Sequence, residues 1–131
     1  MNQQPRPLGL RTSRDIVEAL NGLPVPAYVF DTETMRFLAA NGKFEGLLGH
    51  TEAELREMTI EDIRPQQDVV PLRDRVKRQP PAGLVPTQYF KKDGTMLDIK
   101  VHYRDVAYSD DAGASVNARL VVVEFWKAAA L

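Results

Sequence analysis

The sequence predicts a single α+β domain: a five-stranded antiparallel sheet with short helices on one face and an N-terminal helix. Three observations predict it. Residues 41–65 carry several helix start and stop signals in little sequence, and short helices of this kind need a broad apolar surface to hold them. Residues 97–103 alternate apolar and polar side chains, the period of a half-buried strand. Residues 121–123 are uniformly apolar, as expected of a central strand.

The composition bounds the class of protein. The chain has 131 residues, 44% of them hydrophobic, enough for one core and too few for two domains. A formal net charge of −1 gives no field that would recruit nucleic acid or an anionic membrane. The absence of cysteine excludes disulfides, thiolate metal sites and cysteine nucleophiles. Because the sequence shows neither a signal peptide nor a membrane-spanning run, we expect a cytoplasmic protein.

The chain divides into a flexible lead with a flanking helix, one domain and a short tail, at 1–22, 23–127 and 128–131. The flanking helix is predicted at about 12–21, because Thr12 or Ser13 can cap it and Asn21-Gly22 can end it. One face of this helix is apolar and carries Ile16, Val17 and Leu20.

The first half of the domain is predicted as two strands, at 27–30 and 37–40, followed by helices. Asn41 is a good N-cap for the first helix, and Gly49 can adopt the left-handed conformation that ends it. Two more helices start at a threonine with an acid three residues later, the capping-box pattern: Thr51 with Glu54, and Thr59 with Asp62. A longer helix is predicted at 68–78, where we interpret Arg73, Arg75, Lys77 and Arg78 as a solvated face.

The second half is predicted as strands. Residues 84–91 lead into Asp93-Gly94, a hairpin signal that calls for positive φ at both residues. A strand at 97–103 follows, in which His102 is out of phase with the apolar face and is expected to point to solvent. After a polar loop at 109–115, the last strand is predicted at 119–126.

With this order of elements, the chain resembles a PAS domain from about residue 23 to 125. Three segments carry the resemblance: AANGKFEGLLGHTEAEL at 39–55, MTIEDIRPQQD at 58–68 and FKKDGTMLDIKV at 90–101. They are similar to the family's asparagine-capped turn, its "DI(H/R)P" entry into the long helix, and its "KDG" hairpin. The resemblance is to PAS input domains of bacterial histidine kinases and cyclic-di-nucleotide enzymes.

The resemblance implies a sensory signal-transduction module without catalysis of its own, which binds a small apolar or amphipathic ligand or a signalling partner. The alternative is a pure protein–protein interaction domain with a filled core. A small cup-shaped enzyme would need polar groups converging inside the cup, and the in-facing positions of the strand at 97–103 are apolar. The candidate pocket lining is Val29, Phe44, Leu48, Leu97, Ile99, Val101, Tyr103, Val121 and Val123.

No cofactor or metal is predicted. The haem ligand of haem-binding PAS domains lies on the longer helix, and residues 68–78 contain no histidine. A covalent flavin adduct needs a cysteine, and the chain has none. His50 and His102 stand alone, and no His, Asp and Glu cluster has the spacing of metal ligands.

The terminal segments predict a homodimer. An apolar helix face and an end-of-strand tryptophan must cover something: either the chain's own outer sheet face or a second copy of the chain. Two-fold pairing is the commonest arrangement of soluble oligomers. The candidate interface is Ile16, Val17, Leu20 and Trp126, with Trp126 expected on the outer face.

Overall fold

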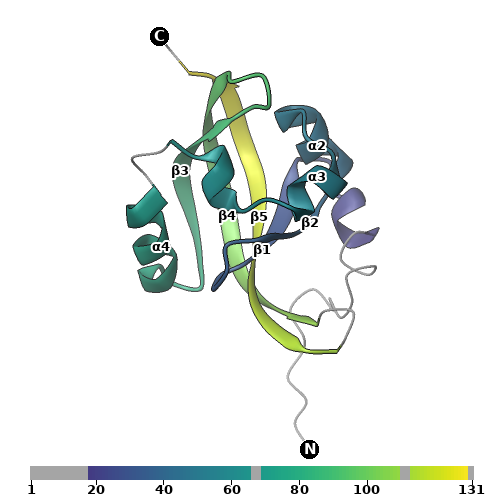
Figure 1. Ribbon diagram of the computed structural model, residues 1–131, viewed down its shortest axis with the longest axis vertical. Coiled ribbons are helices and arrows are strands. Elements are labelled where there is room, and N and C mark those ends of the chain that lie inside the picture. Colours follow the sequence, from purple (N-terminus) through teal and green to yellow (C-terminus); the bar gives the residue numbers. More distant parts are fainter. Residues whose placement is uncertain (1–17, 66–68, 110–112, 130–131) are drawn as a thin grey trace, which may run out of the picture.

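The computed structural model describes residues 18–65, 69–109 and 113–129, which contain an antiparallel sheet in the order β2-β1-β5-β4-β3. Helices α2, α3 and α4 lie on one side of this sheet, here called the inner face (Figure 1). The α+β fold predicted from the sequence is therefore confirmed. The elements are β1 (Ala27–Asp31), β2 (Phe37–Ala40), α2 (Gly42–Leu48), α3 (Glu52–Arg56), η2 (Ile60–Ile63), α4 (Val69–Arg78), β3 (Ala82–Phe90), β4 (Met96–Ser109) and β5 (Ser115–Ala128).

Local signals set the helical cluster as predicted. The Asn41 side chain accepts a hydrogen bond from the backbone N–H of Phe44 and starts α2, and Gly49 ends it with a φ of 86°. Thr51 and Glu54 form the capping box of α3. The third helix, η2, is a 3-10 turn rather than an α-helix. Within the described ranges, no helix is long and apolar enough to cross a membrane.

Aromatic side chains form the centre of the inner core. The ring centroid of Tyr28 lies 4.6 Å from that of Phe44 and 5.2 Å from that of Phe37. All three rings are buried. Leu55 of α3 and Ile63 of η2 join the same cluster, which confirms that the short helices are held by burial against the sheet.

A second core covers part of the opposite, outer face of the sheet. Residues 18–21 are helical, and the Leu20 side chain is 2% exposed among Val29, Tyr108 and Leu120. The sequence left open whether the flanking helix covers the chain's own sheet or a second copy of the chain. Leu20 covers the chain's own sheet. Ile16 and Val17 lie outside the described residues.

Strand β4 changes the face that it buries along its length. Its buried inner-face residues end at Tyr103, and the next buried side chains, Val106 and Tyr108, belong to the outer core. The period-two pattern of a single face therefore ends at Tyr103, although the strand continues to Ser109. For this reason the sequence pattern predicted only the first half of β4.

A bulge in β5 places Trp126 on the inner side of the sheet. The pairing with β4 shifts by one residue around Glu124, and this reverses the phase of the strand beyond it. Trp126 consequently pairs with Ile99, a residue of the inner core, while Phe125 pairs with Lys100. The expectation that Trp126 lies on the outer face is therefore wrong.

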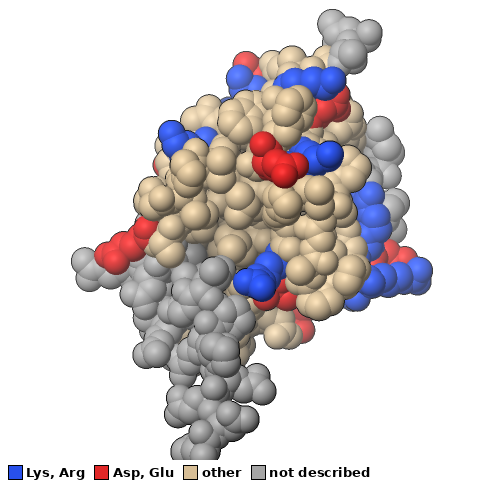
Figure 2. All heavy atoms as spheres, turned by 180° about the vertical axis from the view of Figure 1, so that it is seen from behind, with Lys and Arg blue, Asp and Glu red and all other residues tan. Residues whose placement is uncertain are grey.

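Part of the outer face is open and apolar. Leu84 is 46% and Phe125 is 53% exposed, and their partners in the sheet, His102 and Lys100, are exposed as predicted for out-of-phase positions. His102 Nε2 lies 2.8 Å from Glu124 Oε1 on this surface. Figure 2 views the protein from this side, where residues other than Lys, Arg, Asp and Glu make up most of the visible surface.

The β3–β4 hairpin is confirmed, but its turn differs from the predicted one. The Lys91 N–H donates to the Thr95 carbonyl at 2.8 Å, so the loop is longer than two residues. Gly94 has a φ of 91°, while Asp93 does not have a positive φ. Instead, the Asp93 carboxylate accepts a hydrogen bond from the Thr95 N–H. A longer loop needs the left-handed conformation at one position only.

Candidate functional site

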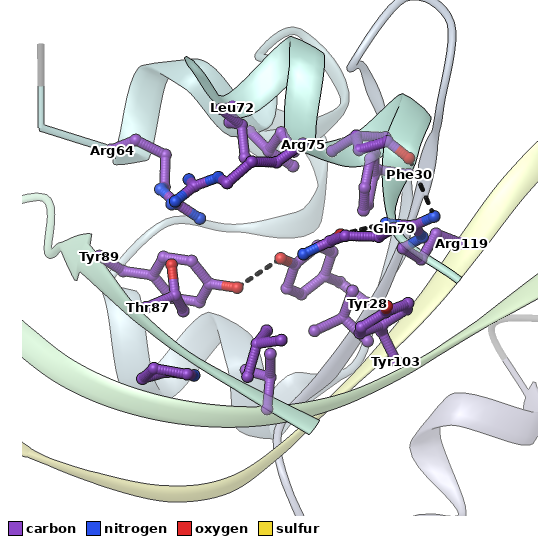
Figure 3. Close-up of a pocket in the computed structure, with 16 residues that line it drawn as sticks. Tyr28, Phe30, Arg64, Leu72, Arg75, Gln79, Thr87, Tyr89, Tyr103 and Arg119 are labelled. Carbon is purple, nitrogen blue, oxygen red and sulfur yellow. Dashed lines mark hydrogen bonds between the residues drawn. The ribbon is translucent and has the colours of Figure 1, made fainter. Parts of the chain in front are cut away.

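A cavity of about 260 Å³ lies between α4 and the inner face of the sheet. Its walls come from β1, η2, α4 and the strands β3 to β5, and apolar side chains such as Phe30, Leu72 and Val121 make up much of the lining (Figure 3). Pockets for drug-sized ligands measure roughly 300–1,000 Å³. This cavity is slightly smaller and suits a small metabolite.

Arg119 of β5 is a buried arginine in the cavity wall, only 4% exposed. Its Nε donates to Asp105 Oδ1 at 2.7 Å, its Nη1 to Gln79 Oε1 at 2.7 Å, and its Nη2 to the Val76 carbonyl at 3.2 Å. The guanidinium carbon lies 4.5 Å from the centre of the Tyr103 ring, within cation–π distance. A guanidinium has five N–H groups. One N–H on each terminal nitrogen is therefore without a partner among the described residues.

Two tyrosine hydroxyls meet inside the cavity. Tyr28 Oη and Tyr89 Oη are 2.5 Å apart and share a hydrogen bond. Burial raises the pKa of both hydroxyls above the ordinary value, so both stay protonated at neutral pH. The pair carries two protons and its mutual hydrogen bond uses one. The second proton can be donated to a ligand.

Thr87 of β3 contributes a third hydroxyl. Its side-chain oxygen is buried and has no hydrogen-bond partner among the described residues. Thr87 pairs with Ile99 and lines the cavity, where Figure 3 shows it next to Tyr89. Leaving a buried hydroxyl unpaired costs about 1–3 kcal/mol. A ligand that binds this oxygen would remove that cost.

Three arginines border the cavity, and one of them, Arg119, forms an ion pair with Asp105. Arg64, Arg75 and Arg119 line it, and no aspartate or glutamate is found among the described lining residues. The basic residues of α4 were interpreted from the sequence as a solvated face, but they differ in position. Arg73 pairs with Glu61 at 2.6 Å, whereas Arg75 contributes to the cavity. Arg75 is exposed, as that interpretation expects, and it also borders the cavity.

Of the residues predicted to line a pocket, Val101, Tyr103 and Val121 line this cavity. Five others are buried in the inner core away from the cavity wall: Phe44, Leu48, Leu97, Ile99 and Val123. Val29 was predicted wrongly. Successive residues of a strand point to opposite faces, so Tyr28 and Phe30 face the helices and Val29 lies in the outer core.

Sequence analysis missed the polar residues of the site. The position of Arg119 could have been predicted from the sequence. It precedes Val121 by two residues in the same strand, so it points to the same face of the sheet as Val121 and Val123. The position of Thr87 could not have been predicted, since the alternation of β3 is not visible in the sequence. From the sequence, whether polar side chains point into the cup was judged on the strand at 97–103 alone, which belongs to β4. They converge instead from β1, β3, β5 and α4.

The described residues of the predicted dimer interface, Leu20 and Trp126, do not lie together, and the two histidines lie apart from each other. Trp126, 44% exposed, lies in a shallow hollow beside α2, and Leu20 is buried. His50 is half-buried, and His102 lies on the outer face. In the part of the chain that the structure describes, no three His, Asp or Glu residues are grouped to hold a metal ion.

Comparisons with known proteins identify the fold. No protein-family model matches the sequence, and no curated protein matches it. Among solved structures, it is similar to a PAS domain of an HTR-like protein from Haloarcula marismortui, with a TM-score of 0.66, 15% identity, and 89% of this chain and 91% of that chain covered. It is also similar to a PAS domain from a two-component sensor histidine kinase, with a TM-score of 0.62 and 17% identity. That match covers 84% of this chain and 91% of the PAS domain.

A third similar structure is the LOV protein of Rhodobacter sphaeroides, with a TM-score of 0.64 and 16% identity. That match covers 85% of this chain and 64% of the LOV protein. At these identities the similarity concerns the fold, and it agrees with the strand order and the inner-face helices described above. The chain has the fold of a PAS domain.

Proposed function

We propose that this chain is a sensory signalling module that binds a small molecule in the cavity under α4, without catalysis of its own. The observation that carries this function is a cavity whose largely apolar lining also includes the buried polar groups of Arg119, Thr87 and the Tyr28–Tyr89 pair. Nearly all buried polar groups have a hydrogen-bond partner, so the unpartnered Thr87 hydroxyl in the wall of this cavity favours a ligand. The solved PAS domain of a sensor histidine kinase supports the sensory role.

The proposed ligand is neither haem nor a covalently bound flavin. The described helix α4 contains no histidine to hold a haem iron, and the chain has no cysteine to form a flavin adduct. We therefore expect the ligand to be a small molecule held without a covalent bond.

A pair of variants on β3 tests the cavity. Val85 lines it and Leu84, its neighbour, points to the outer face, because successive strand residues alternate. In native mass spectrometry of protein purified from its own host, we expect the parent to carry a small bound mass. Val85→Phe should lose this mass because the larger ring fills the space, and Leu84→Phe should retain it.

The filled-core alternative predicts a different result. If the parent carries no bound mass, and if a library of small metabolites raises the melting temperature of neither the parent nor Leu84→Phe, then the cavity does not serve as a ligand site. The chain would then act through its surface alone.

We also propose that the module is a homodimer, paired through the open outer face. Leu84 and Phe125 expose apolar side chains there. In a two-fold symmetric dimer, these two side chains of each copy would be buried against the other copy. In analytical ultracentrifugation, the parent is expected to be a dimer and Leu84→Glu with Phe125→Glu a folded monomer. Arg56→Glu, at an exposed position on α3, should leave the dimer intact. A parent that stays monomeric at high micromolar concentration would exclude this pairing.

A further inference from the structure

The only tryptophan of the chain is exposed in a hollow between β5 and α2. Trp126 is 44% exposed near the end of β5, and α2 lies beside this part of the strand (Figure 1). Pro24, Pro26 and Leu47 line the same surface, here called the Trp126 hollow. Its lining shares no residue with that of the cavity under α4. An exposed tryptophan in a hollow is typical of an anchor point for a protein partner.

The charged side chains that line the Trp126 hollow are basic. They are Lys43 of α2 and Lys91 of the β3–β4 turn, and no aspartate or glutamate is found among the described lining residues. Neither lysine forms an ion pair within the described ranges. The acids closest to them in the chain, Glu45 and Asp93, accept hydrogen bonds from backbone N–H groups. Because the whole chain has a formal net charge of −1, this positive charge is local, and it favours a partner that carries carboxylates.

Gly46 lies in the middle of α2 and lines the Trp126 hollow. Glycine at such a position lowers the stability of a helix relative to alanine. The described structure gives no reason for it, because its φ is not positive and a Cβ atom there would meet no other segment within 4 Å. Glycine is also used where another backbone must approach closely. A partner chain that lies against α2 would use the space left by the missing side chain.

We propose that the Trp126 hollow binds an acidic peptide segment of a partner protein. An apolar side chain of the segment packs on Trp126 and the two prolines, and the backbone of the segment lies against Gly46. Its carboxylates pair with Lys43 and Lys91. Nucleic acid fits this surface less well, because its phosphates recruit many basic side chains and the lining has only two among the described residues.

Selection from a tryptophan-free library of random dodecapeptides tests the proposal. The full chain is immobilised, and peptides that also bind Trp126→Ala are removed. We expect the enriched peptides to be rich in aspartate and glutamate and to share an aromatic or leucine residue. Because Trp126 is the only tryptophan of the chain, its fluorescence should change when an enriched peptide is added. Replacing the acids of the peptide by their amides, or raising NaCl from about 0.05 to about 0.5 M, should weaken binding several-fold.

Variants locate the contact through the fluorescence anisotropy of a labelled enriched peptide. Trp126→Ala should weaken binding at least about tenfold, because it truncates the anchor. Phe125→Ala, the neighbouring exposed aromatic on the outer face, should leave binding unchanged. Lys43→Gln should weaken binding about two- to fivefold, whereas Lys77→Gln, exposed on α4 outside the hollow, should not. Circular dichroism checks the fold of each variant.

Gly46→Ala separates binding from stability. Alanine is the better helix former, so this variant should melt a few degrees above the parent. Its methyl group should nevertheless weaken peptide binding several-fold, because it holds the partner's backbone away from α2. Damage to the fold cannot explain a variant that is more stable and binds less tightly, so this variant carries the test if Trp126→Ala does not fold.

The contrary results are equally specific. The proposal is wrong if no peptide is enriched, if the enriched peptides lack acids, or if Trp126→Ala and Gly46→Ala bind the labelled peptide as tightly as the parent. It is also wrong if an oligothymidine strand binds more tightly than the peptide. If Trp126→Ala converts a dimeric parent to a monomer in analytical ultracentrifugation, a second copy of the chain covers the hollow and no acidic partner does. None of these results depends on whether the cavity under α4 binds a small molecule.

Discussion

Val123→Asp is expected to unfold the protein at neutral pH. Val123 is fully buried on β5, the central strand, and it packs in the inner core without lining the cavity. An aspartate there would place an unpaired carboxylate among apolar side chains, at a cost of several kcal/mol. Domains of this size are stable by only about 5–15 kcal/mol, so the loss is a large part of the total. Far-UV and near-UV circular dichroism during thermal unfolding measure the effect.

The control for this variant is Arg56→Asp on α3, where the side chain is exposed and lies away from the outer face. It introduces the same carboxylate with water around it and should shift the melting temperature by only a few degrees, since surface substitutions change stability by about 0.5 kcal/mol. Cooperative melting of Val123→Asp close to the parent's temperature would show that the faces of β5 are assigned wrongly.

Asn41→Leu is expected to destabilise the protein by about 3–5 kcal/mol, because buried hydrogen-bonding groups lose their partners. Asn41 is 1% exposed. Its Oδ1 accepts from the N–H groups of Ala27 and Phe44, and its Nδ2 donates to the carbonyls of Leu20 and Val25. One side chain therefore joins the flanking helix, β1 and α2. Leucine has a similar size and satisfies none of these four groups.

Chemical denaturation of the parent, Asn41→Leu and Asn41→Asp separates the contributions. The aspartate keeps the two acceptor bonds but turns an anionic oxygen toward the carbonyls of Leu20 and Val25, so it should be strongly destabilised at neutral pH. Because burial and the carbonyls raise the pKa of this carboxyl, Asn41→Asp should regain part of its stability as the pH falls and the carboxyl is protonated, whereas Asn41→Leu should not. Asn117→Leu, at an exposed asparagine of β5, is the control and should be within about 1 kcal/mol of the parent. Equal stability of Asn41→Leu and Asn117→Leu would rule out the role of Asn41 as a buried link.

The sequence alone determined the features that depend on near neighbours in the chain. The caps at Asn41 and Thr51, the left-handed stop at Gly49 and the hairpin before β4 follow from side chains that bind backbone groups a few residues away. The alternation at 97–103 assigned the inner face of β4 correctly, because one covered face leaves a period of two. These features were sufficient to predict the fold.

Only the tertiary structure decided which surface each strand covers and what lies in the cavity. The second half of β4 and Val29 of β1 face the outer core, which exists because the flanking segment folds back onto the sheet. The bulge at Glu124 turns Trp126 to the inner side. The cavity is lined by Arg119 of β5 and Thr87 of β3, two strands that β4 separates in the sheet. Long-range pairing and burial set these positions, and a local pattern carries no information about its partners across the sheet.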